Sequence, residues 1–115
     1  MGDLTETDGR LAVLHPRGSL DGDAAASLKE EARERLEAGE DVVLDMADVS
    51  FTDSEGLSVL VAVYKLAASR ERRFALARVR SNLRALLEIT RLHRVFEVFP
   101  EVEDARGAFA ETRGA

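Results

Sequence analysis

The chain has 115 residues, of which 45% are hydrophobic and 33% charged, and its formal net charge is −6 at pH 7. This length and balance are typical of one folded domain and exclude a disordered chain, while the negative charge argues against general nucleic-acid binding. The absence of cysteine excludes disulfides, and residues 1–6 lack the features of a signal peptide. We therefore expect a cytoplasmic protein, without membrane insertion because the longest apolar run, residues 59–64, is far too short to span a bilayer.

Short apolar runs predict the strands of a mixed, mostly parallel sheet of four to five strands. The four runs cover residues 10–15, 41–46, 73–79 and 94–99. The turn pair Asp8-Gly9 indicates a further short strand before the first run. Charged helical segments separate these strands, which is the pattern of an α/β protein. We expect a single domain over residues 1–115, with its core at about 10–110.

About four helices are expected to pack on this sheet. In the first, apolar residues recur at helical spacing over 25–36, with Asp21 or Asp23 as N-cap and Gly39 at its end. A third helix begins with Ser81 as its cap, and its apolar side consists of Leu83, Leu86 and Leu87. The last helix is defined by Val102, Ala105 and Phe109, and is expected to fray into residues 111–115.

The second helical segment, residues 57–68, has features of both helix and strand. Its valines favour a strand, but its length and the preceding residues favour a helix. Thr52 and Glu55 fit a capping box, in which the two side chains satisfy free N–H groups of the first turn. The helix is apolar nearly all round, so it must be buried on several sides or offer apolar surface to a partner.

Ser54 is the residue on which a function would depend. In this register it lies in the first turn beyond the cap, so its hydroxyl can face solvent, and Gly56 would let a partner approach the backbone. A phosphate there would add about 1.5 to 2 negative charges. The helix N-terminus would stabilise it by about 0.3 to 1 kcal/mol, whereas nearby carboxylates of a partner would be repelled. The alternative is that this segment is only a well-capped helix start.

Charge is unevenly distributed along the chain. Residues 70–94 contain eight arginines and two glutamates, a local charge of +6. Residues 20–55 contain twelve carboxylates and three cations, a local charge of −9. If these segments lie on different faces, the molecule is polarised and its charge can steer partners. The alternative is that these charges, including those of Arg78, Arg80 and Arg84, only solvate the surface.

Two short motifs stand before helical segments: Gly18-Ser19-Leu20-Asp21 and Asp53-Ser54-Glu55-Gly56-Leu57. They resemble motifs of the STAS domain family and, within it, of the bacterial anti-sigma factor antagonists. Residues 42–45, 49–51 and 86–90 are similar to the segments that surround these motifs in the family. The resemblance covers about residues 11–109.

The resemblance implies a partner switch controlled at Ser54. An anti-sigma factor that is also an ATP-dependent serine kinase would bind the unphosphorylated chain and release its sigma factor. Phosphorylation of Ser54 would end that binding, and a PP2C-type phosphatase would restore it. The implied partner-binding residues are Asp21, Asp53, Ser54, Gly56 and Leu57.

This chain departs from the family pattern at three places. Glu55 stands where the family commonly has a small residue, so a negative charge lies beside the phosphorylation site. Arg91 stands where a glycine often ends the third helix, and residues 69–73 lack the glycine common before the next strand. The last two changes bear on local geometry more than on the switch.

Catalysis, metal binding and cofactor binding are not expected. His15 and His93 share no ligand spacing with carboxylates, Ser54 lacks a G-x-S-x-G elbow and an identifiable base, and no phosphate-binding loop is present. The alternatives to the switch are a scaffold in a signalling assembly, a cytoplasmic accessory subunit of a transporter, or a small hydrolase or nucleotide-binding enzyme. The sequence leaves self-association open.

Overall fold

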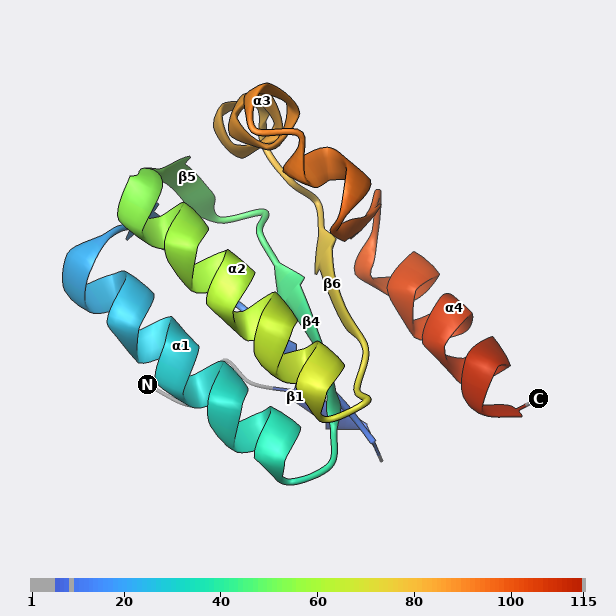
Figure 1. Cartoon of the computed structure of the whole chain (residues 1–115). Coiled ribbons are helices and arrows are strands. Elements are labelled where there is room, and N and C mark those ends of the chain that lie inside the picture. The colour runs from blue at the N-terminus through green and yellow to red at the C-terminus, as the bar shows by residue number, and fades with distance from the viewer. Residues whose placement is uncertain (1–5, 9, 115) are drawn as a thin grey trace.

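The computed structural model describes residues 6–8 and 10–114, in which helices cover both faces of a five-stranded sheet (Figure 1). Strand β1 is antiparallel to β2, and the remaining neighbours are parallel. The predicted mixed α/β fold is therefore confirmed, including the short strand before residue 9. In sheet order the strands are β1 (Glu6–Asp8), β2 (Leu11–Leu14), β4 (Asp41–Asp45), β6 (Phe74–Ala77) and β7 (Glu97–Phe99).

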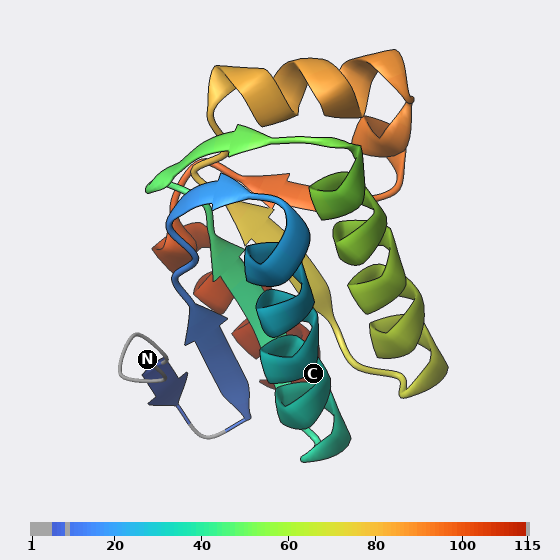
Figure 2. The same ribbon diagram turned by 90° about the vertical axis from the view of Figure 1, so that its left-hand side faces the viewer.

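Helices α1 (Gly22–Glu37) and α2 (Ser54–Ser69) lie side by side on one face of the sheet, and α4 (Val102–Gly114) lies on the other (Figures 1 and 2). The strands between them are buried on both faces, which is why β2, β6 and the centre of β4 are continuous apolar runs rather than alternating ones. Helix α3 (Ser81–Ile89) crosses one end of the sheet (Figure 2).

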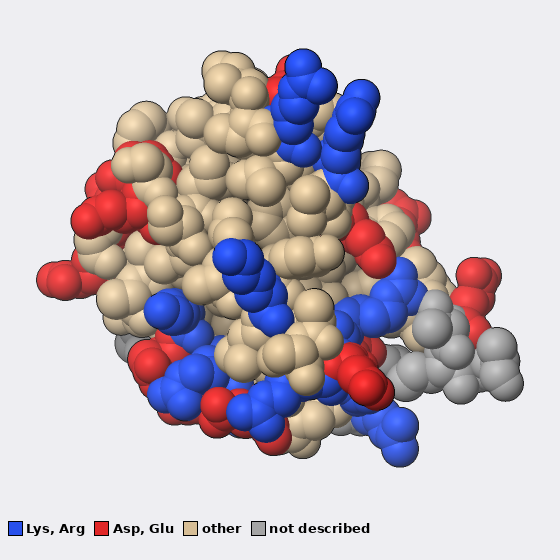
Figure 3. Space-filling model, viewed as in Figure 1, with Lys and Arg blue, Asp and Glu red and all other residues tan. Residues whose placement is uncertain are grey.

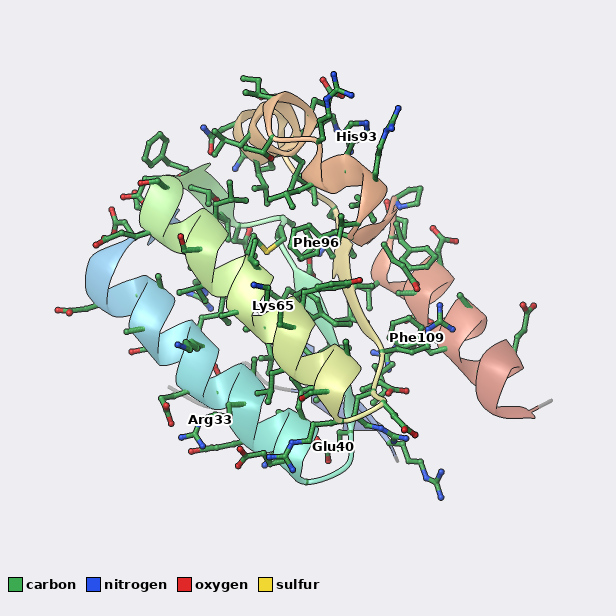
Figure 4. All side chains as sticks on the ribbon, in the orientation of Figure 1. Arg33, Glu40, Lys65, His93, Phe96 and Phe109 are labelled. Atoms are coloured by element: carbon green, nitrogen blue, oxygen red, sulfur yellow. The ribbon has the colours of Figure 1, made fainter. Side chains whose placement is uncertain are left out.

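Each face of the sheet has its own core. On the α1–α2 face, Phe96 makes edge-to-face contacts with Tyr64 and Phe74. On the α4 face, Phe109 points from the helix toward the sheet and contacts Phe99 in the same way (Figure 4). The prediction of helix for residues 57–68 is confirmed, because Leu60, Val63 and other apolar side chains of α2 fill the first core.

A second, two-stranded parallel sheet was not predicted. It pairs β3 (Gly18–Leu20) with β5 (Val49–Thr52), and it leads directly into α1 and α2. Both strands are short and half-exposed, so neither carries the apolar run that identifies the buried strands. The predicted strand over 94–99 is also shorter, because Leu92–Arg94 form a turn of 3₁₀-helix (η2) and the strand starts at Glu97.

At the two places where the family commonly has a glycine that this chain lacks, another residue adopts the left-handed conformation. Arg91 follows the end of α3 with φ of 63°, and Glu71 follows α2 with φ of 57°. Side chains other than glycine rarely adopt this region, so the turns are kept at some energetic cost. These departures leave the fold unchanged.

Two helix ends differ from prediction. Ser81 is the first helical residue of α3, and Arg80 occupies the N-cap position. Helix α4 continues to Gly114 instead of fraying from residue 111. The predicted end of α1 is confirmed, since Gly39 follows the C-cap with φ of +90°. Among the described residues, no helix has the length and apolar character needed to cross a membrane.

Candidate functional site

Ser54 is the first residue of α2 and its side chain is exposed, as the sequence predicted. The preceding residue, Asp53, is the N-cap, and its Oδ1 accepts a hydrogen bond of 3.0 Å from the N–H of Gly56. The Ser54 hydroxyl therefore stands at the positive end of α2 without being used for capping. Such a position stabilises added negative charge.

The predicted capping box is wrong. Thr52 belongs to β5, where its N–H donates to Oδ1 of Asn82 at 2.7 Å, so it cannot act as the N-cap. Glu55 does not turn back to its own helix, and its Oε1 accepts a hydrogen bond of 3.0 Å from the N–H of Gly22. The cause is the pairing of β5 with β3, which keeps Thr52 extended and brings the start of α1 within reach of Glu55.

The small sheet brings Asp21 and Asp53 to the same end of the molecule. Leu20 pairs with Thr52 in the parallel register, and the two aspartates are the residues that follow. They are the N-cap residues of α1 and α2, although Asp21 makes no side-chain capping bond. Asp21, Asp53 and Ser54 therefore lie at the same end of the molecule, and their part in partner binding stays a prediction.

Gly56 has a different role from the one predicted. It is buried, and a Cβ atom there would lie 2.3 Å from the carbonyl oxygen of Leu20. The close approach that we expected from a partner is therefore made by β3 of the chain itself. Leu57 is half-buried and packs against the core. Both residues therefore hold the first turn of α2, on which Ser54 is exposed, against the rest of the domain.

An exposed aromatic residue beside this turn was missed by the sequence reasoning. Phe51 lies on β5 and retains 47% of its surface exposed, so it offers apolar area next to the start of α2. The signal in the sequence is an aromatic residue directly before the hydroxyl-rich turn. Aromatic side chains in such positions are common anchors of protein interfaces.

The surface charge is polarised only in part. Acidic side chains gather where α1 and α2 begin, whereas acidic and basic side chains intermingle where these helices end (Figure 3). Ion pairs such as Arg70–Glu37 join the basic segment to the acidic one and offset their charges. Ser54, as the first residue of α2, lies at this negative end.

A second polar cluster lies at the carboxyl ends of β2, β4 and β6. Arg78 binds the buried Asp45 through two hydrogen bonds, of 3.0 Å from Nε and 2.7 Å from Nη2, and Nδ1 of His15 lies 3.2 Å from Asp45 Oδ2. The Arg78 guanidinium is thus engaged within the domain and does not only solvate the surface. Burial alone would raise the pKa of Asp45, but hydrogen bonds from Arg78 and Ala47 outweigh it and lower that pKa.

A cavity of about 270 Å³ opens beside this cluster, but its lining offers little chemistry. Positive and negative side chains alternate around it, and none of the lining residues carries a hydroxyl or thiol nucleophile. Its lining consists of His15, Asp45, Arg78, Glu101, Val102, Glu103 and Arg106. Among the described residues, no group of three or more side chains is placed to hold a metal ion.

Comparison with known proteins shows the family of this chain. Residues 4–105 match the family model of the STAS domain. The chain is 35% identical over 98 residues to the anti-sigma-B factor antagonist of Listeria monocytogenes, covering 84% of this chain and 85% of that protein.

Solved structures extend the likeness to three dimensions. An anti-sigma factor antagonist from Mycobacterium paratuberculosis superposes with a TM-score of 0.80 at 26% identity, covering 91% of this chain and 90% of that one. The phosphorylated form of the Bacillus cell fate determinant SpoIIAA shares the fold, with a TM-score of 0.74 at 17% identity and coverage of 91% and 96%. The chain belongs to the STAS domain family.

Proposed function

We propose that this chain is an anti-sigma factor antagonist that acts by reversible protein binding and is switched by phosphorylation of Ser54. The observation that carries the proposal is the exposed Ser54 hydroxyl at the first position of α2. The names of the Listeria and Mycobacterium relatives support the same role. In its unphosphorylated form the chain binds an anti-sigma factor and thereby frees a sigma factor.

Phosphorylation at this position leaves the fold intact. The phosphate would lie at the N-terminus of α2, where the helix dipole stabilises an anion by about 0.3 to 1 kcal/mol. Ser54 is exposed, so no buried contact is lost.

Docking responds in the opposite way. The phosphate adds about 1.5 to 2 negative charges to a surface that already presents Asp21 and Asp53. A like charge of a partner at 4 Å is repelled by about 1 kcal/mol in water and by about 4 kcal/mol at the lower effective dielectric of an interface. A modest number of such contacts is enough to dissociate the complex.

The anti-sigma factor is itself the serine kinase of the proposed cycle, and a PP2C-type phosphatase returns the chain to its binding form. The chain supplies the acceptor hydroxyl and the docking surface, and it carries out no catalysis. Asp53 and Leu57 contribute by holding the first turn of α2 in place.

An affinity pull-down from the source cells, read by mass spectrometry, tests this proposal. The baits are wild type, Ser54→Ala, Ser54→Glu and the control Ser69→Glu, which places the same charge on an exposed serine at the opposite end of α2. We expect a serine kinase on wild type, Ser54→Ala and Ser69→Glu but not on Ser54→Glu. Incubation of the recovered kinase with wild type and ATP should place phosphate on Ser54. The same partners on all four baits would reject Ser54 as the control point and favour a scaffold role.

A further inference from the structure

We propose that Glu55 is a positioning residue that fixes Asp21 beside Ser54 by binding the first N–H group of α1. This inference rests on the proposed function, because it concerns the same docking surface. It follows from the hydrogen bond of 3.0 Å between the N–H of Gly22 and Oε1 of Glu55, two residues 33 positions apart in the chain.

The first turn of α2 holds the chain on both sides of Asp21. Before it, the carbonyl of Leu20 packs against Gly56 so closely that a Cβ atom would clash at 2.3 Å. After it, the N–H of Gly22 is bound by Glu55. Since Glu55 and Gly56 are consecutive, one rigid turn sets the backbone of Asp21 relative to Ser54.

Glu55 supplies a cap that α1 does not make for itself. The first N–H groups of a helix need acceptors from outside the helix. Asp21 occupies the N-cap position but makes no side-chain capping bond, and Gly22 begins the helix with φ of +43°. The carboxylate of Glu55 fills this need, with a charge-assisted bond at the positive end of α1. The Asp21 carboxylate is thus left out of helix capping and can serve the surface.

This contact also accounts for a charged side chain next to the proposed phosphorylation site. The carboxylate of Glu55 reaches across to α1, where the backbone N–H of Gly22 binds it. Its negative charge is therefore partly offset by the dipole of α1. A glutamate at this position is compatible with an accessible hydroxyl on Ser54.

Amide hydrogen exchange of the free protein, followed by NMR, tests the contact without any partner. The variants are Glu55→Ala, which removes the acceptor, Glu55→Gln, which keeps an acceptor oxygen, and Glu34→Ala, which removes an exposed glutamate from the second half of α1. We expect exchange of the Gly22 amide to be about tenfold faster in Glu55→Ala, as for loss of one charged hydrogen bond. Glu55→Gln should restore most of the protection and Glu34→Ala should not change it. An unchanged Gly22 amide in Glu55→Ala would overturn the proposal.

Affinity for the serine kinase recovered by the pull-down provides the second readout. We expect Glu55→Ala to bind about tenfold more weakly, with Glu55→Gln within about twofold of wild type. Equal affinity of Glu55→Ala and wild type would overturn the positioning role. Equal weakening in Glu55→Ala and Glu55→Gln, with Gly22 still protected in Glu55→Gln, would also overturn it, because Glu55 would then contact the partner through its charge.

The two failures can be told apart. If the wild-type protein retains no serine kinase, the proposed function fails, while exchange of the Gly22 amide still reports whether Glu55 holds the start of α1. If wild type binds and Glu55→Ala binds equally, the function stands and the positioning role is rejected.

Discussion

The carbonyl oxygen of Leu20 lies against Gly56 at the start of α2, so that a Cβ atom on residue 56 would be only 2.3 Å from it. The same Cβ would be 2.9 Å from Cγ2 of Thr52. Both neighbours belong to the small β3–β5 sheet, and the Leu20 atom is part of the backbone, which cannot rotate away. Glycine at this position is therefore what allows α1, α2 and the small sheet to meet.

Replacing Gly56 by alanine should destabilise the domain. Alanine favours a helix interior by about 1 kcal/mol relative to glycine, but the overlap with Leu20 forces a backbone shift that costs about 1 to 3 kcal/mol or more. We expect a net loss in the free energy of unfolding, measured by urea denaturation. The control is Gly107→Ala in α4, where a gain of about 0.5 to 1 kcal/mol is expected. Outside its chain neighbours and its own helix backbone, the added Cβ meets no atom of the described residues within 4 Å. A gain at both positions would contradict the packing argument.

Asp45 should make stability depend on pH in the acid range. Its pKa in the folded protein is lowered from 3.8, so its contribution is fully present above about pH 4 and is lost as the pH falls through the folded pKa. Asp45→Asn should therefore reduce the free energy of unfolding by about 1 to 3 kcal/mol at neutral pH. The difference from wild type should shrink as the pH falls below about 4 and through the lowered pKa of Asp45. Urea unfolding at several pH values measures this, and a difference that stays constant with pH would refute it.

Phe51 should be an anchor of the proposed interface. It is 47% exposed on β5, next to the start of α2. Phe51→Ala is expected to weaken binding of the recovered serine kinase by about 2 kcal/mol, roughly 30-fold, as interface aromatics do. The control is Val95→Ala. Val95 is similarly exposed but lies beside Tyr64 and Ala68, two residues of the second half of α2. Calorimetric titration measures both, and equal affinities of the two variants would remove Phe51 from the interface.

Arg73 should fasten α4 to the sheet. Its guanidinium lies 4.3 Å from the ring centroid of Phe109, donates to the carbonyl of Ala108 at 3.2 Å and binds Glu97 at 2.6 Å. Lysine cannot make these contacts together, so Arg73→Lys should cost about 1 to 2 kcal/mol of stability. Thermal unfolding measures the loss, with Arg84→Lys on the exposed surface of α3 expected within about 0.5 kcal/mol of wild type. Equal stability of the two variants would contradict this role.

The main sheet and its helices could be predicted because their signals are local. The centre of β4 is an apolar run between two aspartates, and the apolar residues of α1 recur at helical spacing. Strands β3 and β5 are short and half-exposed, and they exist only because two distant segments pair. The capping box was wrong for the same reason. Thr52 could cap α2 only if it did not belong to β5.

The candidate site divides in the same way. Ser54 could be identified from its own neighbourhood, a serine placed just beyond a helix cap. The partners of Glu55 and Gly56 could not, because Gly22 and Leu20 meet them only when β3 pairs with β5. The contact of Asp45 with Arg78 depends similarly on adjacent ends of β4 and β6.

The most direct test of the switch is the dissociation constant of the recovered serine kinase for the same protein with and without phosphate on Ser54. Calorimetric titration at one ionic strength measures both forms, and the fold of each is checked by circular dichroism. Phosphorylation is predicted to weaken binding at least about 100-fold, equivalent to roughly 3 kcal/mol, while both forms remain folded. Equal dissociation constants for the two forms would contradict the central claim.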